Sequence, residues 1–378
     1  MGIGNGGTLY SPVIDPTNPD TVYLGSDVGG VFRTGDGGRS WRPINESIFA
    51  NRGRGWFSYT MPALAVDPCR PATIYAAGVT RGIFKSRDRG ESWEVLGTKE
   101  LHETYGLRFR NLAIDPVDCA IVYALLGGSE VTYQSRSKIQ PGPRVFRSRD
   151  GGRTWSAASS GIDPLAEARS IVFLAGSPRS LLVSTTRGVY SSSDGGSKWT
   201  ARNGGLPTTD AGFLAVGRDA EAERDVVYLT LNADGAVYKS VDGGLHWRAA
   251  NGGLPVKEGS RMFAIAVDPR DARRAWTGSA RHSTALNWYR TTDGGESWEA
   301  MDNVFLGWLR IWQKNAIGLS VSASDPSRLY LAGDLGVFRS DDGGDHWTQV
   351  YTREMSHEHW STRGLDENGA LSIAFSRD

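Results

Sequence analysis

The sequence predicts an all-β protein, a seven-bladed β-propeller in which each blade is a four-stranded antiparallel sheet. One turn signature occurs seven times, with neighbouring copies 44 to 62 residues apart. A period of this size marks a repeat architecture. Between the copies, short apolar runs alternate with turn residues, and no window longer than a turn or two has a helical period. The 48 glycines and 13 tryptophans among 378 residues are typical of many short antiparallel strands.

The signature is clearest at Ser148–Trp155, which reads Ser-Arg-Asp-Gly-Gly-Arg-Thr-Trp. The aspartate can accept hydrogen bonds from turn amides, and glycine adopts positive φ without steric cost, so the pattern predicts a tight hairpin. The tryptophan is expected to bury its ring and to find a partner for its N–H. This pattern is the Asp box. Its aspartates and tryptophans are Asp36 and Trp41, Asp88 and Trp93, Asp150 and Trp155, Asp194 and Trp199, Asp242 and Trp247, Asp293 and Trp298, and Asp342 and Trp347. Because a feature repeated in all seven blades serves the scaffold, we predict that these seven aspartates form turns and are neither ligands nor catalysts.

Each repeat is predicted to contain strands A, B, C and D. In the second repeat, strand A ends in the turn Leu64–Pro68, strand B is Thr73–Ala77, strand C is Gly82–Ser86, and strand D begins at Trp93 after the Asp box. With up-and-down strand order, the A–B and C–D turns share one side of the ring. The B–C turns and D-to-A connectors share the other.

Neighbouring blades bury each other's faces, so residues 1–350 are predicted to form one cooperative propeller domain. Residues 351–378 are predicted to be a C-terminal tail. This tail either closes the ring through an extra strand at Leu371–Phe375 or forms the junction to a second domain.

The charge balance argues against two classes of partner. Lysine plus arginine equals aspartate plus glutamate at 42 each, so no overall field favours nucleic acid or an anionic membrane. No apolar run reaches the length of a membrane span. The histidines are dispersed without metal spacing, and we expect no metal or cofactor. The start of the chain does not resemble a signal peptide, so the protein is expected to be cytoplasmic, or secreted with its leader removed.

Cys69 and Cys119 each follow the A–B turn of consecutive repeats. A bridge between neighbouring turns is conceivable. Because spacing alone does not bring two Cα atoms within bonding range, two free thiols are expected instead.

The B–C turns and D-to-A connectors vary most between repeats, and such loops usually carry function. Several hold aromatic side chains beside arginines, which suits stacking on sugar rings with polar groups binding hydroxyls. The alternative is that these residues close the channel mouth or pack on the next blade. The candidate substrate-binding residues are Arg54, Trp56, Tyr59, Arg81, Tyr105, Trp308 and Trp312. By contrast, Trp276 and Trp288 fall at strand positions and are expected in the core.

Two aspartates are candidate catalytic residues. When the seven B–C turns are aligned on the tyrosine of strand B, a carboxylate occupies the fourth following position only in blades 1 and 7, as Asp27 and Asp334. These blades become neighbours when the ring closes. Glycoside hydrolysis needs one protonated and one ionised carboxyl group, separated by about 6.5–9.5 Å for inversion and about 5–5.5 Å for retention. The alternative is that both are ordinary turn aspartates before glycine.

The segments Gly6–Tyr10, Asp15-Pro16 and Leu24–Arg33 resemble the start of the xyloglucan-degrading glycoside hydrolases that are built from two seven-bladed propellers. In that family the corresponding turn reads T-D-[VI]-G-G-x-[YF], and the resemblance implies that Asp27 is a catalytic carboxylate. The tail segment Trp360–Asn368 resembles the stretch that leads into the family's second propeller.

The second catalytic aspartate of that family comes from the second propeller. Either this partner is missing, Asp334 takes its place, or the chain is half of a larger enzyme. The resemblance thus implies a carbohydrate-active protein that acts on or binds a β-glucan or xyloglucan-type polysaccharide. The alternative is a non-catalytic propeller that binds a protein or glycan partner, similar to sortilin-type receptors and photosystem assembly factors.

Overall fold

The structure is a computed structural model of the chain. It describes residues 12–26, 30–44, 63–78, 82–96, 109–126, 142, 144–174, 180–257, 261–281, 284–301, 316–333, 336–350, 353–356 and 359–361.

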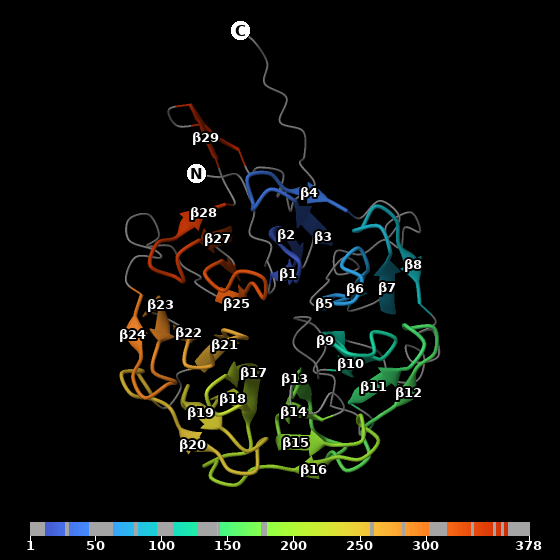
Figure 1. The fold of residues 1–378 in the computed structure, drawn as a ribbon, viewed down its shortest axis with the longest axis vertical. Helices are drawn as coiled ribbons and strands as arrows, with labels where there is room; N and C mark the ends of the chain where they lie inside the picture. Colours follow the sequence, from blue (N-terminus) through green and yellow to red (C-terminus); the bar gives the residue numbers. More distant parts are fainter. Residues whose placement is uncertain are drawn as a thin grey trace, which may run out of the picture.

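Seven four-stranded antiparallel sheets surround a central opening, as the sequence predicts (Figure 1). Within each sheet the four strands follow chain order. Blades 1 to 3 are β1 (Val13–Asp15), β2 (Asn18–Gly25), β3 (Val31–Thr34) and β4 (Arg42–Pro43); β5 (Ala63–Val66), β6 (Ile74–Gly78), β7 (Gly82–Ser86) and β8 (Glu94–Val95); and β9 (Phe109–Ile114), β10 (Val122–Leu126), β11 (Val145–Ser148) and β12 (Ser156–Ala157).

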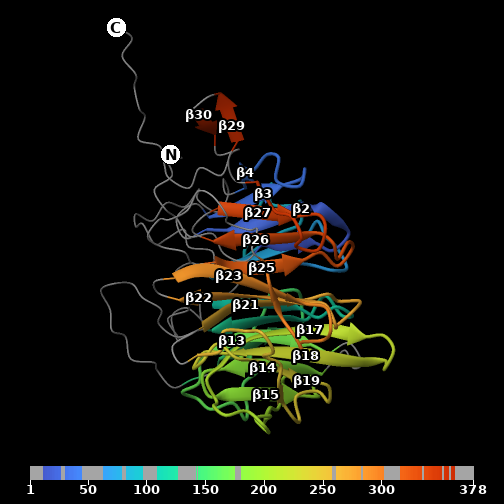
Figure 2. The same cartoon turned by 90° about the vertical axis from the view of Figure 1, so that its left-hand side faces the viewer.

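Blades 4 to 7 repeat the arrangement. They are β13 (Ala168–Phe173), β14 (Leu181–Thr185), β15 (Gly188–Ser192) and β16 (Thr200–Ala201); β17 (Ala211–Asp219), β18 (Arg224–Leu231), β19 (Val237–Ser240) and β20 (Arg248–Ala249); β21 (Arg261–Val267), β22 (Ala275–Arg281), β23 (Thr284–Thr291) and β24 (Glu299–Ala300); and β25 (Ala316–Val321), β26 (Leu329–Gly333), β27 (Gly336–Ser340) and β28 (Thr348–Gln349). A separate hairpin, β29 (Arg353–Ser356) and β30 (His359–Ser361), lies outside the ring (Figures 1 and 2).

The burial of each strand follows its position in the blade. The second strands are covered on both faces by neighbouring blades, and β6, β10 and β14 are buried along their whole length. Strands covered on both faces read as continuous apolar runs, as Val122–Leu126 does. The fourth strands are two residues long and mostly exposed at the outer rim. Within the described residues there is no long apolar helix of the kind that crosses a membrane.

The A–B turns and the Asp boxes lie on the same side of the ring, as predicted. In blade 1 the amide of Gly37, in the box, donates to the Asp20 carbonyl, in the A–B turn, at 2.9 Å. The amide of Gly151 donates to the Ala120 carbonyl in the same way in blade 3, at 2.8 Å. Figure 2 views the ring edge-on, with the strands running across its thickness.

The tryptophans of the Asp boxes join neighbouring blades. Trp199 in blade 4 is 2% exposed, and its indole N–H donates to the Ala158 carbonyl at the end of blade 3, at 2.7 Å. Equivalent bonds leave the indoles of Trp41, Trp93, Trp247 and Trp298. The two exceptions, Trp155 and Trp347, donate to a carbonyl of their own box. The expected N–H partner is therefore confirmed for all seven tryptophans. The expected ring burial is confirmed for Trp41, Trp199, Trp247 and Trp298, whereas the rings of the other three are partly buried.

The ring closes through side chains at the seam between blades 7 and 1. A hydrophobic cluster is shared across this seam by Val22, Leu24, Phe32, Trp41, Tyr330, Ala332, Val337 and Val350. The Trp41 indole donates to the Val350 carbonyl at 2.9 Å, and Arg328 forms an ion pair with Asp20 at 2.6 Å. Each of the seven blades takes its four strands from one stretch of chain. The tail residues Leu371–Phe375, proposed as an extra strand, lie outside the described residues.

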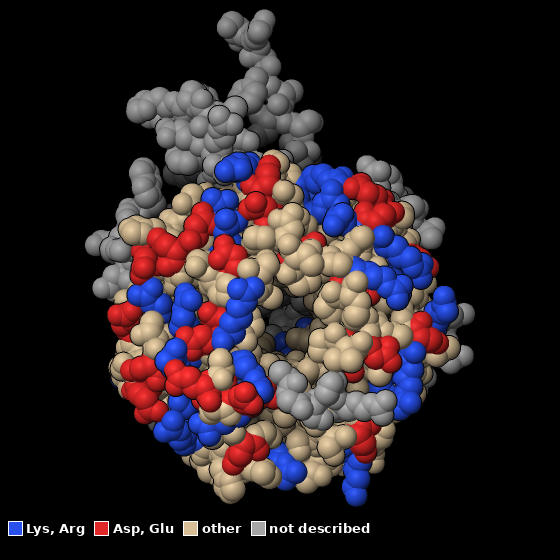
Figure 3. All heavy atoms as spheres, in the orientation of Figure 1, with Lys and Arg blue, Asp and Glu red and all other residues tan. Residues whose placement is uncertain are grey.

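Positive and negative side chains are interspersed on the face of the ring turned to the viewer in Figure 3, and the opening at its centre is visible. This mixture agrees with the balanced charge of the sequence.

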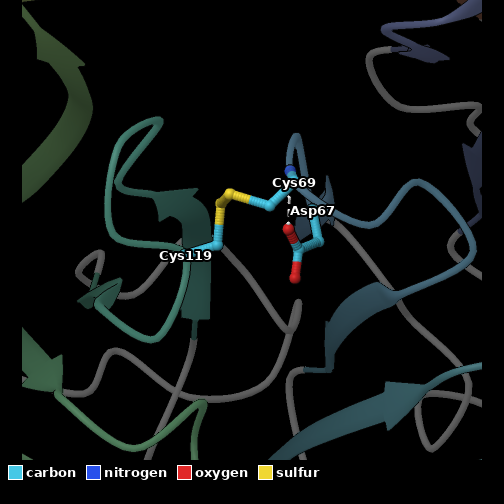
Figure 4. Close-up of side chains that lie close together, drawn as sticks. All are labelled: Asp67, Cys69 and Cys119. Atoms are coloured by element: carbon cyan, nitrogen blue, oxygen red, sulfur yellow. Dashed lines mark hydrogen bonds between the residues drawn. A yellow bond between two sulfur atoms is a disulfide. The ribbon is translucent and has the colours of Figure 1, made fainter.

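The expectation of two free thiols is wrong. Cys69 and Cys119 form a disulfide, with their Cα atoms 6.2 Å apart (Figure 4). Both cysteines follow an Asp-Pro turn between the first and second strands, one in blade 2 and one in blade 3. The two turns lie side by side across the seam between blades 2 and 3. The closed ring brings them together, and the spacing of the cysteines in the sequence does not reveal this.

Candidate functional site

In the Asp boxes, the aspartate side chain is hydrogen-bonded to residues of its own turn. In blade 3 the Asp150 carboxylate accepts hydrogen bonds from the Ser148 hydroxyl at 2.8 Å and from the Thr154 amide and hydroxyl at 2.9 and 2.7 Å. These bonds, led by the one from the Thr154 hydroxyl, lower the pKa of Asp150 to about 2. The pKa values of the other six box aspartates are also lowered. A carboxylate with its oxygens committed in this way is a turn former, as predicted.

Blades 5 and 7 carry histidine where other boxes carry serine or threonine. The Nδ1 atoms of His246 and His346 lie 2.8 and 2.6 Å from the carboxylates of Asp242 and Asp342. Both histidine side chains are more than 80% exposed, at 84% and 86%. Each histidine takes the place of the serine or threonine hydroxyl as the hydrogen-bond partner of the box aspartate.

The two candidate catalytic aspartates, Asp27 and Asp334, lie outside the described residues, and the structure describes the strand ends on either side of each. Asp27 falls between Ser26 and Gly30, where the Ser26 amide donates to the Gly30 carbonyl at 2.8 Å. Asp334 falls between Gly333 and Gly336, which pair at the end of β26 and β27. The strands that lead into these turns share one hydrophobic cluster across the 7–1 seam. The two turns therefore leave adjacent blades, at the ends opposite the Asp boxes.

The seven candidate substrate-binding residues also lie outside the described residues; they are Arg54, Trp56, Tyr59, Arg81, Tyr105, Trp308 and Trp312. The expectation that Trp276 and Trp288 lie in the core is confirmed. Trp276 and Trp288 are 0% and 1% exposed. The Trp276 indole donates to the Gly343 carbonyl of the next blade at 2.9 Å.

The innermost strands carry a repeated irregularity that the sequence did not reveal. In five consecutive blades the pairing between the first and second strand slips near the start of the first strand, which leaves extra residues on that strand. The extra residues are Arg110, Arg169, Gly212 with Phe213, Phe263 and Ile317. Such bulges redirect side chains and are frequent beside binding sites.

Blades 4 and 5 bring polar groups together at these bulges. Nη1 of Arg169 donates to Oδ1 of Asp210 at 2.8 Å and to the Ala211 carbonyl at 2.7 Å. Nδ2 of Asn232 lies 3.3 Å from the same carboxylate oxygen. Burial lowers the pKa of Arg169, partly offset by Asp210. Phe213, two residues beyond Ala211, is 36% exposed. No sequence pattern pointed to Arg169 or Phe213, because their placement depends on strand register.

One group of potential metal ligands occurs in the described residues. A carboxylate oxygen of Asp67 and the sulfurs of Cys69 and Cys119 all lie within 4.8 Å of one another (Figure 4). The disulfide occupies both sulfurs, and Asp67 accepts a hydrogen bond from the Cys69 amide at 2.9 Å. Since thiolate is the metal-binding form of cysteine, the oxidised pair offers no sulfur ligand.

These features define the chain as an Asp-box seven-bladed β-propeller. The model of the BNR/Asp-box repeat matches residues 146–157. The chain is 30% identical over 176 residues to xyloglucanase Xgh74A of Acetivibrio thermocellus, a match that covers 43% of this chain and 19% of that enzyme.

Solved structures show the same fold. An ancestral GH74 enzyme superposes with a TM-score of 0.73 at 20% identity, over 93% of this chain and 47% of that one. YCF48 bound to D1 peptide superposes with a TM-score of 0.57 at 13% identity, over 88% of this chain and 90% of that one. The match spans about a fifth of the length of the xyloglucanase and about half of the solved GH74 enzyme.

Proposed function

We propose that this chain is a carbohydrate-active propeller, a glycoside hydrolase-like protein that acts on a xyloglucan-type β-glucan through its B–C and D-to-A loops. The observation that carries the proposal is the 30% identity to a xyloglucanase over 176 residues. The seam between blades 7 and 1 supports it, because the strands that flank Asp27 and those that flank Asp334 belong to adjacent blades.

In the proposed reaction Asp27 is the candidate base and Asp334 the candidate acid. The protonated carboxyl group donates its proton to the glycosidic oxygen as the bond to the anomeric carbon breaks. The ionised carboxylate takes a proton from the water whose oxygen bonds to that carbon. This inverting route requires the two carboxyl groups to be about 6.5–9.5 Å apart. Trp56, Tyr59, Tyr105, Trp308 and Trp312 are proposed to stack on sugar rings, with Arg54 and Arg81 binding hydroxyls.

The test is release of reducing sugar from xyloglucan and a panel of other β-glucans. Asp27→Asn is expected to lower the rate by about 10²–10⁴-fold, because it removes a group that transfers a proton in the transition state. Asp219→Asn is the matched control, since Asp219 ends the first strand of blade 5, in the turn on the opposite side of the ring. No sugar release from any glucan by the parent protein would reject hydrolysis of these substrates.

We also propose that the chain works with a second domain or a protein partner. The resemblance to the xyloglucan-degrading enzymes implies that the second catalytic aspartate comes from a second propeller. The Asp334→Asn variant separates the two arrangements. If Asp334 supplies the acid, this variant loses activity as Asp27→Asn does. If a second propeller supplies it, Asp334→Asn is as active as the parent, and the role proposed for Asp334 is wrong.

The second candidate function is non-catalytic binding of a protein or glycan partner. It is supported by the fold that the chain shares with YCF48, whose solved structure has D1 peptide bound. Retention on xyloglucan affinity gels without sugar release is the result expected for a glycan-binding propeller. Retention together with Asp27-dependent release is the result expected for the hydrolase.

We also propose that the protein is secreted. The Cys69–Cys119 disulfide supports this location, because such bridges persist in oxidising compartments and are rare in the cytosol. Thiol titration of protein isolated from its native source is expected to detect no free cysteine, and two free thiols would contradict secretion.

A further inference from the structure

The rim of the central channel at blades 4 and 5 carries a compact group of polar and aromatic side chains, here called the inner-rim cluster: Arg169, Asp210, Phe213 and Asn232. Arg169 and Phe213 are bulge residues of the innermost strands β13 and β17. Asp210 immediately precedes β17, and Asn232 immediately follows β18. Blades 4 and 5 lie across the ring from the 7–1 seam (Figure 1), so the cluster is separate from the strand ends that flank Asp27 and Asp334.

Buried hydroxyl groups hold the bulges of this cluster in place. The Thr230 hydroxyl accepts a hydrogen bond from the Phe213 amide at 2.8 Å, and the Ser184 hydroxyl donates to the Gly212 carbonyl at 2.6 Å. Both Thr230 and Ser184 are completely buried. Placing two hydroxyls in the core is favourable only when they are hydrogen-bonded, as these are. The backbone of the blade 5 bulge, at Gly212 and Phe213, is therefore held by the surrounding core.

Arg169 and Asp210 are held by hydrogen bonds, but each has further polar atoms with which a ligand could bond. Arg169 makes both of its hydrogen bonds through Nη1, so among the described residues its Nε and Nη2 atoms have no partner. The Asp210 side chain is 43% exposed, and the bonds that it accepts from side chains in the described part of the chain both go to Oδ1. A guanidinium donor and a carboxylate acceptor thus lie side by side, and Phe213, three residues beyond Asp210 in the chain, has an exposed side chain.

This combination suits one class of ligand. Each hydroxyl of a sugar both donates and accepts, so two adjacent hydroxyls match a neighbouring donor and acceptor. The C–H face of a pyranose is apolar and can cover an aromatic ring. An anionic ligand fits less well, because the Asp210 carboxylate offsets the charge of Arg169 and repels a second carboxylate.

We propose that the inner-rim cluster is a second, non-catalytic binding site for a neutral pyranose. Adjacent hydroxyls bind Arg169 and Asp210, and the ring packs on Phe213. Asn232 positions the Asp210 carboxylate. The site works whether or not the protein hydrolyses glucans, and it lets the propeller hold a glycan chain away from the 7–1 seam.

The test is a titration by saturation-transfer NMR with glucose, xylose and cellobiose, carried out on the Asp27→Asn protein so that no substrate is consumed. Phe213→Ala is expected to weaken binding about tenfold, as loss of a stacking contact does. The matched control is Leu165→Ala, because Leu165 is another exposed apolar side chain on this part of the chain, at 40% exposure. Thermal melting confirms that both variants are folded.

Three outcomes would overturn the proposal: equal binding by Phe213→Ala and Leu165→Ala, no binding of any neutral sugar, or tighter binding of glucuronate than of glucose. The result is independent of the proposed hydrolase function. Sugar binding that depends on Phe213 without any glucan hydrolysis supports this site and rejects the enzyme. Glucan hydrolysis without sugar binding that depends on Phe213 supports the enzyme and rejects this site.

Discussion

The second Asp box shows how one residue can disturb a repeated turn. Arg89 has a φ of +59° where the other six boxes have glycine with φ between +69° and +79°. A side chain in this left-handed region costs about 1–2 kcal/mol. Nearby, Tyr23 is fully buried, and among the described residues its hydroxyl has no hydrogen-bond partner. In contrast, the hydroxyl of Tyr123 donates to the Gly195 carbonyl of the next box at 2.8 Å.

Replacing Arg89 by glycine is therefore expected to stabilise the protein by up to about 1 kcal/mol. The gain from relieved backbone strain exceeds the entropy that glycine adds to the unfolded chain. The midpoint of urea unfolding measures the change. The reciprocal variant Gly151→Ala, at φ +70°, is the control and is expected to be destabilised. A lower midpoint for Arg89→Gly would show that the arginine side chain contributes more than its backbone costs.

The lowered pKa values of the box aspartates predict loss of stability in acid. Folding moves the pKa of Asp150, Asp293 and Asp342 from 3.8 to about 2, chiefly through hydrogen bonds from their own turns. A carboxyl group with a lower pKa in the folded state stabilises the protein above its unfolded pKa and loses this effect as the pH falls through its folded pKa. The melting temperature is thus expected to fall between about pH 4 and pH 2.

Asp150→Asn tests this account at one box. The variant is expected to melt below the parent at pH 7, with a difference that shrinks as the pH approaches 2, because the parent carboxylate is then protonated as well. A difference that does not depend on pH would show that the charge of Asp150 is irrelevant to its role in the turn.

At the scale of elements, turn chemistry and strand pattern predicted most of the fold. The sequence Asp-Gly-Gly followed by Trp determines a hairpin locally. The continuous apolar run Val122–Leu126 predicts a strand that is buried on both faces. The disulfide was mispredicted because it depends on two turns meeting across a seam. The bulge at Phe213 was missed because register is set by the buried hydroxyls of the facing strand. Asp27 and Asp334 stay predictions, since they lie outside the described residues.

The disulfide joins the A–B turns of blades 2 and 3. Cys69 and Cys119 are separated by 50 residues, and a bridge closing a loop of that size stabilises the folded state by about 4 kcal/mol in the chain-entropy model. The variant with both cysteines changed to serine is expected to lose most of this stability, as measured by urea unfolding. Reducing agent is expected to destabilise the parent and to leave the double variant unchanged. Equal stability of parent and variant would mean that the seam is held by packing alone.

At the scale of the whole molecule, the 7–1 seam is built like the seams inside the ring. Trp41 crosses it as Trp199 crosses the seam between blades 3 and 4, with exposures of 4% and 2% and indole bonds of 2.9 and 2.7 Å. Arg339 of blade 7 donates to the Gly37 carbonyl of blade 1 at 2.6 Å, and Lys85 of blade 2 binds the Gly151 carbonyl of blade 3 at 2.9 Å. No strand is exchanged between the described blades to fasten the ends.

Equivalent seams should respond equally to the same change. Trp41→Phe and Trp199→Phe each remove one indole N–H and leave a buried carbonyl without its partner, at a cost of about 1–3 kcal/mol. Both variants are expected to unfold in urea in a single transition, with midpoints lowered by the same amount, because every blade depends on both of its neighbours. The control is Trp155→Phe, whose indole donates within its own box, so the lost bond joins no two blades. An early separate transition in Trp41→Phe alone would show that the ring opens at the 7–1 seam before it unfolds.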